Sequence, residues 1–361
     1  MKVIQVGDMA GVGYKVHQLL LGHDFAPRLL VCAPETRFSV MSAADGVTEI
    51  PYKSRRSNFR LLAKLIRSRG TADVYHAHSL MSILLMCSAR PYVAHFHGSD
   101  VHEVASSDTR LGQLLRLAMR RAAHVLHCTH DLAPPIVAAG VAPENMTWLP
   151  NPIDTDRFSR TAPTKDLFPH AGLTILHPQP VRKERRNGLF FEAFVRVARQ
   201  NPDTKLIWFQ HERSGTDHAY YVDYLRQAGV LDQVHQMPRV EPAQMSEYLS
   251  AADVVVDWFN RDLPAVSQTC MEALACERTV IAGLPVDKTH YLHDSGVLAG
   301  GTVDEIEGSL RLLINEPHGQ QERGRKGRAW VQHHHGFDAV REKLRIVYSR
   351  ALQSGVSGAS K

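Results

Sequence analysis

The feature that most constrains the fold is an alternation of short apolar segments with helix-length segments, which occurs twice along the chain. In the first half, strands are predicted at 3–6, 28–32, 74–76, 92–96, 124–127 and 146–149, with helices at 17–21, 60–67, 111–122 and 132–139. In the second half, strands are predicted at 173–176, 205–209, 234–237, 254–257 and 279–282, with helices at 189–199, 220–228, 244–251, 269–276 and 303–314. This spacing is typical of α/β, doubly wound and mostly parallel sheets.

A polar, proline-bearing stretch separates the two runs. It begins at Pro150-Asn151-Pro152 and continues to about Leu167, a composition typical of a linker. A chain of 361 residues also exceeds what one hydrophobic core usually supports. We therefore predict a Rossmann-like domain at 1–160, a second at 161–335, and a helical tail at 336–361 that packs back on the first domain and frays from Ser354 onward.

Composition excludes several classes of protein. No apolar run approaches the eighteen residues that span a bilayer, and Met1-Lys2 leads directly into a predicted strand, so no secretory signal is visible. The five cysteines are scattered without a C-x-x-C pair, which supports neither a zinc site nor a disulfide framework. We expect a cytoplasmic protein.

A glycine-rich segment, residues 7–13, follows the first predicted strand. The backbone N–H groups of Gly11 and Gly13 could approach a phosphate or a sugar hydroxyl. Alternatively, the glycines only let the following helix fit against the sheet. The segment is not G-x-G-x-x-G, and no acidic residue at the end of a second strand suggests a ribose contact, which argues against a nicotinamide enzyme.

A second candidate site is the stretch 265–283, which predicts a loop, a helix and a buried strand. Thr269-Cys270-Met271-Glu272 fits a capping box, with Thr269 accepting a backbone N–H and Glu272 reaching back. A helix start also has free N–H groups and partial positive charge, which suit a phosphate. A carboxylate there could accept hydrogen bonds from a ribose.

Two predicted strand ends carry histidines, in Asp73–Ser79 and in Ala94–Asp100. Imidazoles commonly bind zinc, but no HExxH or other compact ligand spacing lies on one element, so no metal is predicted. Asp154-x-Asp156 likewise resembles a D-x-D metal motif, but it belongs to the linker. A third strand end is followed by the basic run from Arg182 to Gly188, whose charges could neutralise a diphosphate.

Over nearly its whole length the chain resembles the retaining glycosyltransferases of the glycosyltransferase group 1 class, family 4. The resemblance is carried by 265–283, by the histidine strand ends, by the basic run, and by Pro150-Asn151-Pro152-Ile153-Asp154 through Phe158, which matches the P-N-G-V-D…F linker of the family except at Pro152. It implies the GT-B fold, in which two Rossmann-like doubly wound domains face each other across a cleft. The donor would lie in the C-terminal half and the acceptor in the N-terminal half.

The resemblance also assigns roles to residues. His97 would contact the transferred sugar, and Arg182 and Arg186 would stabilise the leaving diphosphate, making these the catalytic set. Donor binding would fall to Gly11, Gly13, Ser267, Gln268, Thr269 and Glu272. The family signature E-x₇-E is incomplete, because Pro264 stands where the first glutamate belongs and the nearest acids are Asp257 and Asp262.

The implied reaction is metal-independent, retaining transfer from a UDP- or GDP-sugar to a hydroxyl acceptor, lipid-linked or small, with no cofactor. The incomplete signature keeps open a non-catalytic subunit that binds nucleotide or a partner, and a sugar-nucleotide epimerase of the same fold. Residues 53–69 hold seven basic and no acidic side chains. They predict an ordinary surface helix, a peripheral membrane contact on the inner face of the membrane, or an anionic acceptor site; aromatic-basic interleaving typical of nucleic-acid binding is absent.

Overall fold

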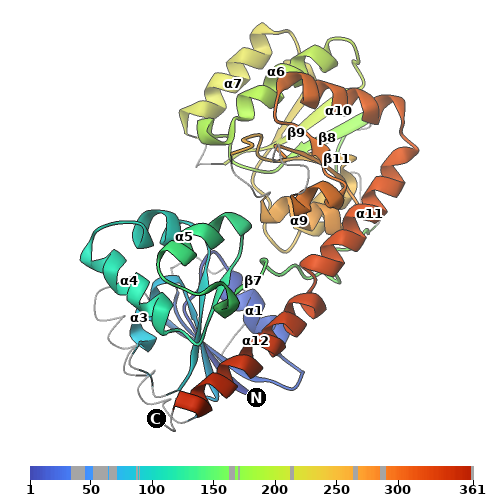
Figure 1. Ribbon diagram of the computed structural model, residues 1–361. Helices are drawn as coiled ribbons and strands as arrows, with labels where there is room; N and C mark the ends of the chain where they lie inside the picture. Colours follow the sequence, from blue (N-terminus) through green and yellow to red (C-terminus); the bar gives the residue numbers. More distant parts are fainter. Residues whose placement is uncertain are drawn as a thin grey trace. The chain divides into compact units, whose positions relative to one another are not determined.

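The computed structural model describes residues 1–33, 45–51, 64, 71–86, 88, 90–161, 167–169, 171–211, 215–262, 267–284 and 290–358. The chain forms two compact units, Met1–Pro152 with Phe337–Lys361, and Ile153–Gly336 (Figure 1). The first boundary follows Pro152, which lies inside the predicted linker but before the predicted domain limit at residue 160. Ile153 joins the second unit because its N–H donates to the His335 carbonyl at 2.8 Å, and Phe158 because its ring is buried there.

The first unit holds a parallel sheet in the order β3-β2-β1-β4-β5-β6-β7. Helices cover both faces, so strands such as β4 and β5 are buried at every residue. The strands are β1 (Lys2–Val6), β2 (Ala26–Ala33), β3 (Val47–Pro51), β4 (Val74–His78), β5 (Tyr92–Phe96), β6 (His124–His127) and β7 (Met146–Trp148). The helices are α1 (Val12–Leu20), α3 (Ser82–Leu85), α4 (Arg110–Arg121), α5 (Ala133–Ala138) and α12 (Phe337–Gly358).

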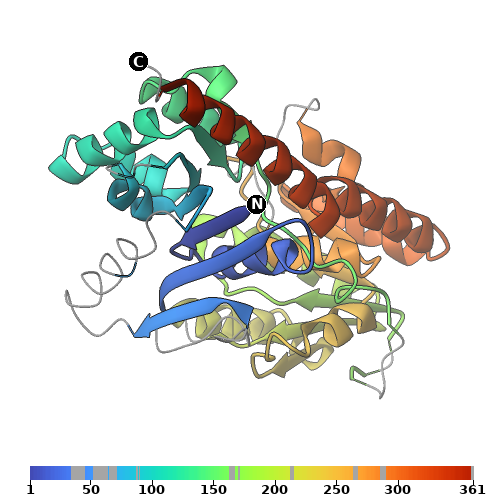
Figure 2. The same cartoon turned by 90° about the horizontal axis from the view of Figure 1, so that it is seen from below.

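The C-terminal helix α12 is part of the first unit. Its buried side chains Val340, Leu344, Val347 and Tyr348 pack with residues of α1 and of the central strands. The helix itself is the dark red ribbon in Figure 2. Residues of α3, α4 and α5 contribute to a separate core cluster with the sheet. Burying this stripe ties the last part of the chain to the first domain, and α12 continues to Gly358, beyond the fraying that the sequence predicts from Ser354.

The second unit repeats the plan with the parallel order β10-β9-β8-β11-β12-β13. Its strands are β8 (Leu173–His177), β9 (Thr204–Phe209), β10 (Val234–Met237), β11 (Val254–Val256), β12 (Thr279–Ala282) and β13 (Leu298–Ala299). Its helices are α6 (Asn187–Ala198), α7 (Thr216–Gln227), α8 (Met245–Ala251), α9 (Gln268–Ala275), α10 (Val303–Asn315) and α11 (Gly319–His334). Residues of α6, α7 and α10 share one core cluster, and residues of α8, α9 and α11 share another.

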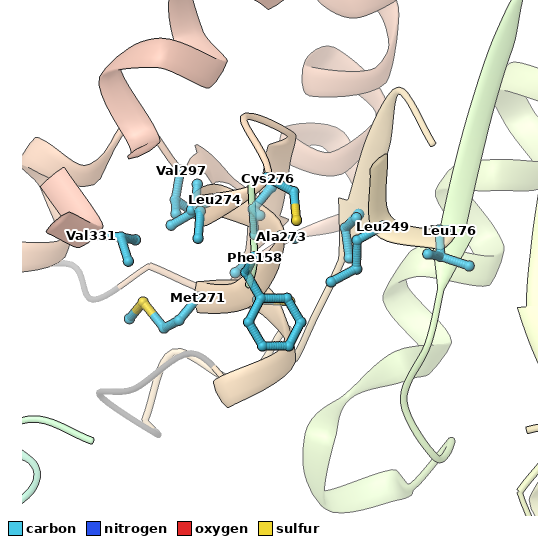
Figure 3. Packing of buried hydrophobic residues seen from close by; sticks show 14 of the residues in the cluster. Phe158, Leu176, Leu249, Met271, Ala273, Leu274, Cys276, Val297 and Val331 are labelled. Atoms are coloured by element: carbon cyan, nitrogen blue, oxygen red, sulfur yellow. The ribbon is translucent and has the colours of Figure 1, made fainter. Parts of the chain in front are cut away.

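Helix α9 is held by its apolar side, as Figure 3 shows. Met271, Leu274 and Cys276 are buried in a cluster with Phe158 of the linker and Val331 of α11. The packing fixes the position of α9, and therefore of its first turn, relative to the sheet.

Two edge strands, β3 and β13, were not predicted from the sequence. β13 has two residues, and β3 carries the polar residues Thr48 and Glu49, so neither has the apolar run that identified the central strands. The predicted helix 60–67 and the basic segment 53–69 lie outside the described residues apart from Lys64. Within the part of the chain that the structure describes, no helix is long and apolar enough to cross a membrane.

Candidate functional site

The basic loop after β8 is fixed by one buried asparagine. Asn187, the first residue of α6, accepts the Arg182 N–H through its Oδ1 at 3.0 Å, and its Nδ2 donates to His177 Nε2 at 3.2 Å. Because an amide nitrogen can only donate, His177 Nε2 must be the acceptor and the ring proton must sit on Nδ1. Burial lowers the pKa of His177 to about 3, which keeps the ring neutral. Motif reasoning assigned no role to Asn187 or His177.

The arginines of this loop differ in their surroundings. Arg182 is half-buried, and among the described residues no carboxylate pairs with its guanidinium. Arg186 is exposed, lies 3.5 Å from the Asp262 carboxylate, and adopts a left-handed backbone conformation with φ 54°. Such a conformation is uncommon for a residue other than glycine. Arg185 instead lies over the Trp258 ring at 4.4 Å, so Arg182 and Arg186 are the arginines of the loop that remain candidates for an anion.

The start of α9 differs from the prediction in its cap. Ser267, not Thr269, is the cap, with its Oγ accepting the Cys270 N–H at 3.3 Å, and the helix begins at Gln268. The predicted capping box between Thr269 and Glu272 is therefore wrong. The sequence interpretation considered only Thr269 as the cap. In the structure the Ser267 Oγ also accepts a hydrogen bond from a residue distant in sequence, Gln179, whose Nε2 lies at 3.1 Å.

The two aspartates nearest to the missing first glutamate have structural contacts. Asp257 follows β11 directly, is fully buried, and accepts the Ser267 N–H. Burial raises the pKa of Asp257, and the hydrogen bonds of its carboxylate oppose that rise. Asp262 is exposed and faces Arg186. Asp257 thus anchors the α9 start, while Pro264 lies outside the described residues.

These loops meet at the point where the strand order of the second unit reverses. From β8 the chain proceeds to β9 on one side, and β11 lies on the other side; ligands of doubly wound sheets bind at such a switch point, beyond the carboxyl ends of the strands. The Phe259 N–H donates to the Arg185 carbonyl at 2.9 Å, and Asn260 Nδ2 donates to the Glu184 carbonyl at 3.0 Å. The basic loop and the segment leading to α9 are therefore joined.

Two side chains at the start of α9, those of Gln268 and Glu272, are candidates to contact a ligand at the switch point. Gln268 Nε2 is buried and has no hydrogen-bond partner among the described residues, although buried donors are normally paired. Glu272 lies half-buried one turn further along the helix.

A cavity of about 690 Å³ adjoins the basic loop after β8. It is lined by Lys183, Arg186, Gly188, Leu189, Tyr221, Gly301, Thr302 and Val303. Cations, helix-start amides and an orphaned donor at one switch point suit a phosphorylated ligand.

The glycine loop of the first unit uses its amides internally. Asp8 accepts the Gly11 N–H at 2.9 Å and the Gly13 N–H at 2.7 Å. Gly7 has φ 88°, and a Cβ there would lie 2.5 Å from Met81 Cγ, so the turn itself requires glycine. The structure favours the second interpretation of this segment, a turn that seats α1 on the sheet, and Asp8 is the residue that the sequence interpretation overlooked.

His97 follows β5 and is held through its backbone. The Asp100 carboxylate accepts the N–H groups of His97 and Gly98, at 3.1 and 2.9 Å. The ring Nε2 contacts His78 Nδ1 at 3.1 Å, and the space where a Cβ of Gly98 would lie is open to 4 Å. Burial lowers the pKa of His97 to about 4, with Asp100 opposing the shift, so the imidazole is neutral at pH 7.

The linker motif is a turn. Asp154 Oδ1 accepts the N–H groups of Asp156 and Arg157 at 3.2 and 3.0 Å. Hydrogen bonds from an aspartate to N–H groups two and three residues on are typical of local turns. This placement agrees with a linker role for the D-x-D sequence.

Protein families and solved structures show the following similarities to this chain. Residues 13–157 match the family model described as Glycosyltransferase Family 4. No match is found among curated proteins. The fold resembles sucrose-phosphate synthase from Thermosynechococcus elongatus, with a TM-score of 0.71 and 14% identity over 98% of this chain and 100% of that one.

Two other solved structures have the same fold. Anabaena Alr3699/HepE, in complex with UDP and glucose, matches with a TM-score of 0.73 and 15% identity over 97% of this chain and 99% of that chain. A glycosyltransferase from Rickettsia africae matches with a TM-score of 0.71 and 12% identity over 97% and 98%. These matches confirm the predicted fold of two Rossmann-like units.

Proposed function

We propose, from the premise that this chain is a family 4 glycosyltransferase with the GT-B fold, that it transfers a sugar from a nucleoside diphosphate sugar to a hydroxyl acceptor with retention of configuration. The observation that carries the proposal is the hydrogen bond between Gln179 and Ser267, which joins the segment leading to the basic loop with the start of α9 at the switch point of the second unit. UDP is the first nucleotide to test, because HepE was solved with UDP and with UDP-glucose.

In this proposal the second unit binds the donor. The diphosphate is held by Arg182 and Arg186 together with the amides at the start of α9 and the free donor of Gln268. Positive charge and N–H groups placed where negative charge develops are usually the largest single contribution to catalysis. Glu272 accepts hydrogen bonds from the ribose. Gly11 and Gly13 are left out of the donor site because Asp8 takes their N–H groups.

The chemistry needs no protein base. As the carbon–oxygen bond to the diphosphate breaks, the departing phosphate oxygen accepts the proton of the acceptor hydroxyl, which bonds to the sugar on the same face. The basic loop replaces a metal ion as the stabiliser of the leaving group. We propose that the first unit binds the acceptor, that the protein is cytoplasmic, and that residues 53–69 form a peripheral membrane contact, on the strength of their seven basic side chains.

Glu272→Ala is expected to weaken UDP binding by about 1–3 kcal/mol, the usual cost of leaving hydrogen-bond partners unpaired. Glu272→Gln should retain part of the affinity, because the amide oxygen still accepts. Isothermal titration calorimetry with UDP measures both, and Glu322→Ala, an exposed glutamate of α11, is the matched control. Because Ser267 caps α9, a loss cannot be attributed to a broken capping box; UDP affinity unchanged in both Glu272 variants would contradict the ribose role.

His97→Ala is expected to lower kcat by about 5- to 150-fold, the equivalent of about 1–3 kcal/mol of lost hydrogen bonding, while the Kd for UDP stays within about twofold. The reason is that His97 would contact the transferred sugar, which UDP lacks. His102→Ala removes an exposed histidine of the same unit and serves as control. Equal losses in kcat and UDP affinity, with a lower melting temperature, would instead make His97 structural.

Donor turnover separates the alternatives. The purified protein incubated with UDP-sugars should release UDP in the presence of an acceptor. Conversion of the donor sugar without an acceptor would indicate an epimerase, and UDP binding without any turnover across acceptors would indicate a non-catalytic subunit. The proposed transfer should persist after dialysis against EDTA.

A further inference from the structure

Four histidines form a two-by-two array at the ends of the adjacent strands β4 and β5, with His97 directly after β5. β4 and β5 pair in parallel with His78 opposite His95, and residues two apart on a strand face the same side of a sheet. The rings of His76 and His78 are stacked with centroids 4.6 Å apart, and those of His95 and His97 lie 4.3 Å apart. Histidines separated by many residues are thus collected in one place by the sheet register.

The spacing of the ring nitrogens is close to that of a metal site. His76, His78 and His95 each offer one ring nitrogen within 4.8 Å of the other two. In a tetrahedral zinc site with Zn–N bonds of about 2.0–2.1 Å, neighbouring nitrogens lie about 3.3–3.4 Å apart. His76 Nε2 and His95 Nδ1 already lie at 3.3 Å. The remaining nitrogen lies at most about 1.5 Å too far away for this geometry. Binding of an ion therefore requires that the ring of His78, now stacked on that of His76, reorients.

The hydrogen bonds and the burial of His76, His78 and His95 favour metal binding by their rings. His76 Nδ1 contacts the buried Tyr348 hydroxyl of α12 at 2.7 Å, which directs its Nε2 toward His95; metal-bound histidines usually have such a partner on their second nitrogen. His78 Nε2 is buried without a hydrogen-bond partner among the described residues, and a buried polar atom without a partner needs an explanation. Burial also lowers the pKa of all three rings, to about 3 for His76, so the neutral form that binds metals prevails.

We propose that His76, His78 and His95 bind one divalent transition-metal ion of the kind that prefers imidazole ligands, with Zn²⁺ as the reference ion. His97 borders this site through its contact with His78, and the ion lies in the first unit, whereas the proposed diphosphate site belongs to the second. The ion supports the strand ends and takes no part in stabilising the leaving group. The site therefore stands or falls independently of the proposed transfer reaction.

The test measures metal content and geometry on the full, untagged chain. Protein dialysed first against EDTA and then against ZnCl₂ and metal-free buffer should retain one equivalent of zinc, measured by mass spectrometry of the metal. Cobalt substitution should give visible d–d absorption bands of a low-symmetry site with nitrogen ligands. Zinc should raise the melting temperature, because an ion that binds only the folded state stabilises it.

Variants assign the ligands. His78→Gln and His95→Gln should lose zinc retention and the cobalt bands, and Tyr348→Phe should weaken binding by about 10- to 100-fold, the usual effect of removing a ligand's hydrogen-bond partner. His124→Gln is the control, because His124 is a buried histidine of the neighbouring strand β6 that bonds to Thr147. No zinc retained by the wild-type chain would overturn the proposal without reference to any variant. Equal retention in the ligand variants and the control would overturn it as well.

Discussion

Arg182→Ala is expected to lower kcat/KM for sugar transfer by about 10²- to 10³-fold, the effect typical of removing one preorganised group that stabilises developing negative charge. Arg182 is half-buried on the loop between β8 and α6, and its backbone is fixed by Asn187. Its guanidinium has no carboxylate partner among the described residues, so an arriving diphosphate would not have to displace one. Steady-state kinetics with the UDP-sugar that the protein turns over measure the loss.

Two further variants sharpen this test. Arg182→Lys should recover only part of the activity, because a point charge cannot replace the paired N–H groups of a guanidinium. Arg226→Ala makes the same change of charge on α7, where the arginine is exposed and pairs with Asp223, and should leave kcat/KM unchanged since exposed pairs contribute little. If the Arg182 and Arg226 variants had equal activity, the basic loop would not be the diphosphate site.

Acidification from about pH 7.5 to about pH 5 is expected to remove about 2 kcal/mol of stability through His177 alone. The pKa of His177 is lowered from 6.5 to about 3 because the ring is fully buried. In the unfolded chain the ring takes up a proton below pH 6.5, whereas the folded ring stays neutral until about pH 3. The unfolded state therefore binds more protons in this window, and the free energy of unfolding falls as the pH falls through it.

The measurement compares urea unfolding of the wild type and of His177→Gln at both pH values. Other buried histidines, among them His76 and His124, titrate in both proteins, so the difference between the two losses reports His177. The wild type should lose about 2 kcal/mol more than the variant. Equal losses, or an NMR titration that places the His177 pKa near its ordinary value, would contradict the expectation.

Protonation of His177 would also affect the proposed donor site, because His177 is connected to Arg182 through Asn187. His177 Nε2 accepts a hydrogen bond from Asn187, and Asn187 holds the N–H of Arg182. A proton on His177 Nε2 would bring two donors, this N–H and the Asn187 Nδ2 group, face to face. The hydrogen bond that holds Asn187 in place would then be lost. If the donor binds at the proposed site, we therefore expect its affinity to depend on the neutral form of His177, which does not itself contact the ligand.

The sequence predicted the central strands well because their signal is local. β5 and β12, which lie inside their sheets, have the predicted bounds, since a strand covered on both faces tends to be a mostly apolar run. β6 and the edge strand β10 have the predicted bounds as well. The start of α9 was predicted one residue late because Thr269 and Glu272 fit a capping box, whereas in the structure Ser267 is the cap and is held by Gln179 and Asp257. The local motif was misleading there because it does not include the contacts that hold Ser267.

The sequence by itself predicted the two Rossmann-like units, which the fold confirms, and a resemblance to family 4 glycosyltransferases, which the family-model match over residues 13–157 supports. Periodicity, linker composition and short motifs are properties of consecutive residues. The tertiary structure decided which polar groups are paired with one another by hydrogen bonds. It assigned the amides of Gly11 and Gly13 to Asp8, made Asp257 the anchor of α9, and gathered histidines from two strands into one cluster. Hydrogen-bond partners and metal ligands depend on which chain segments become neighbours, and in a parallel sheet those neighbours are far apart in sequence.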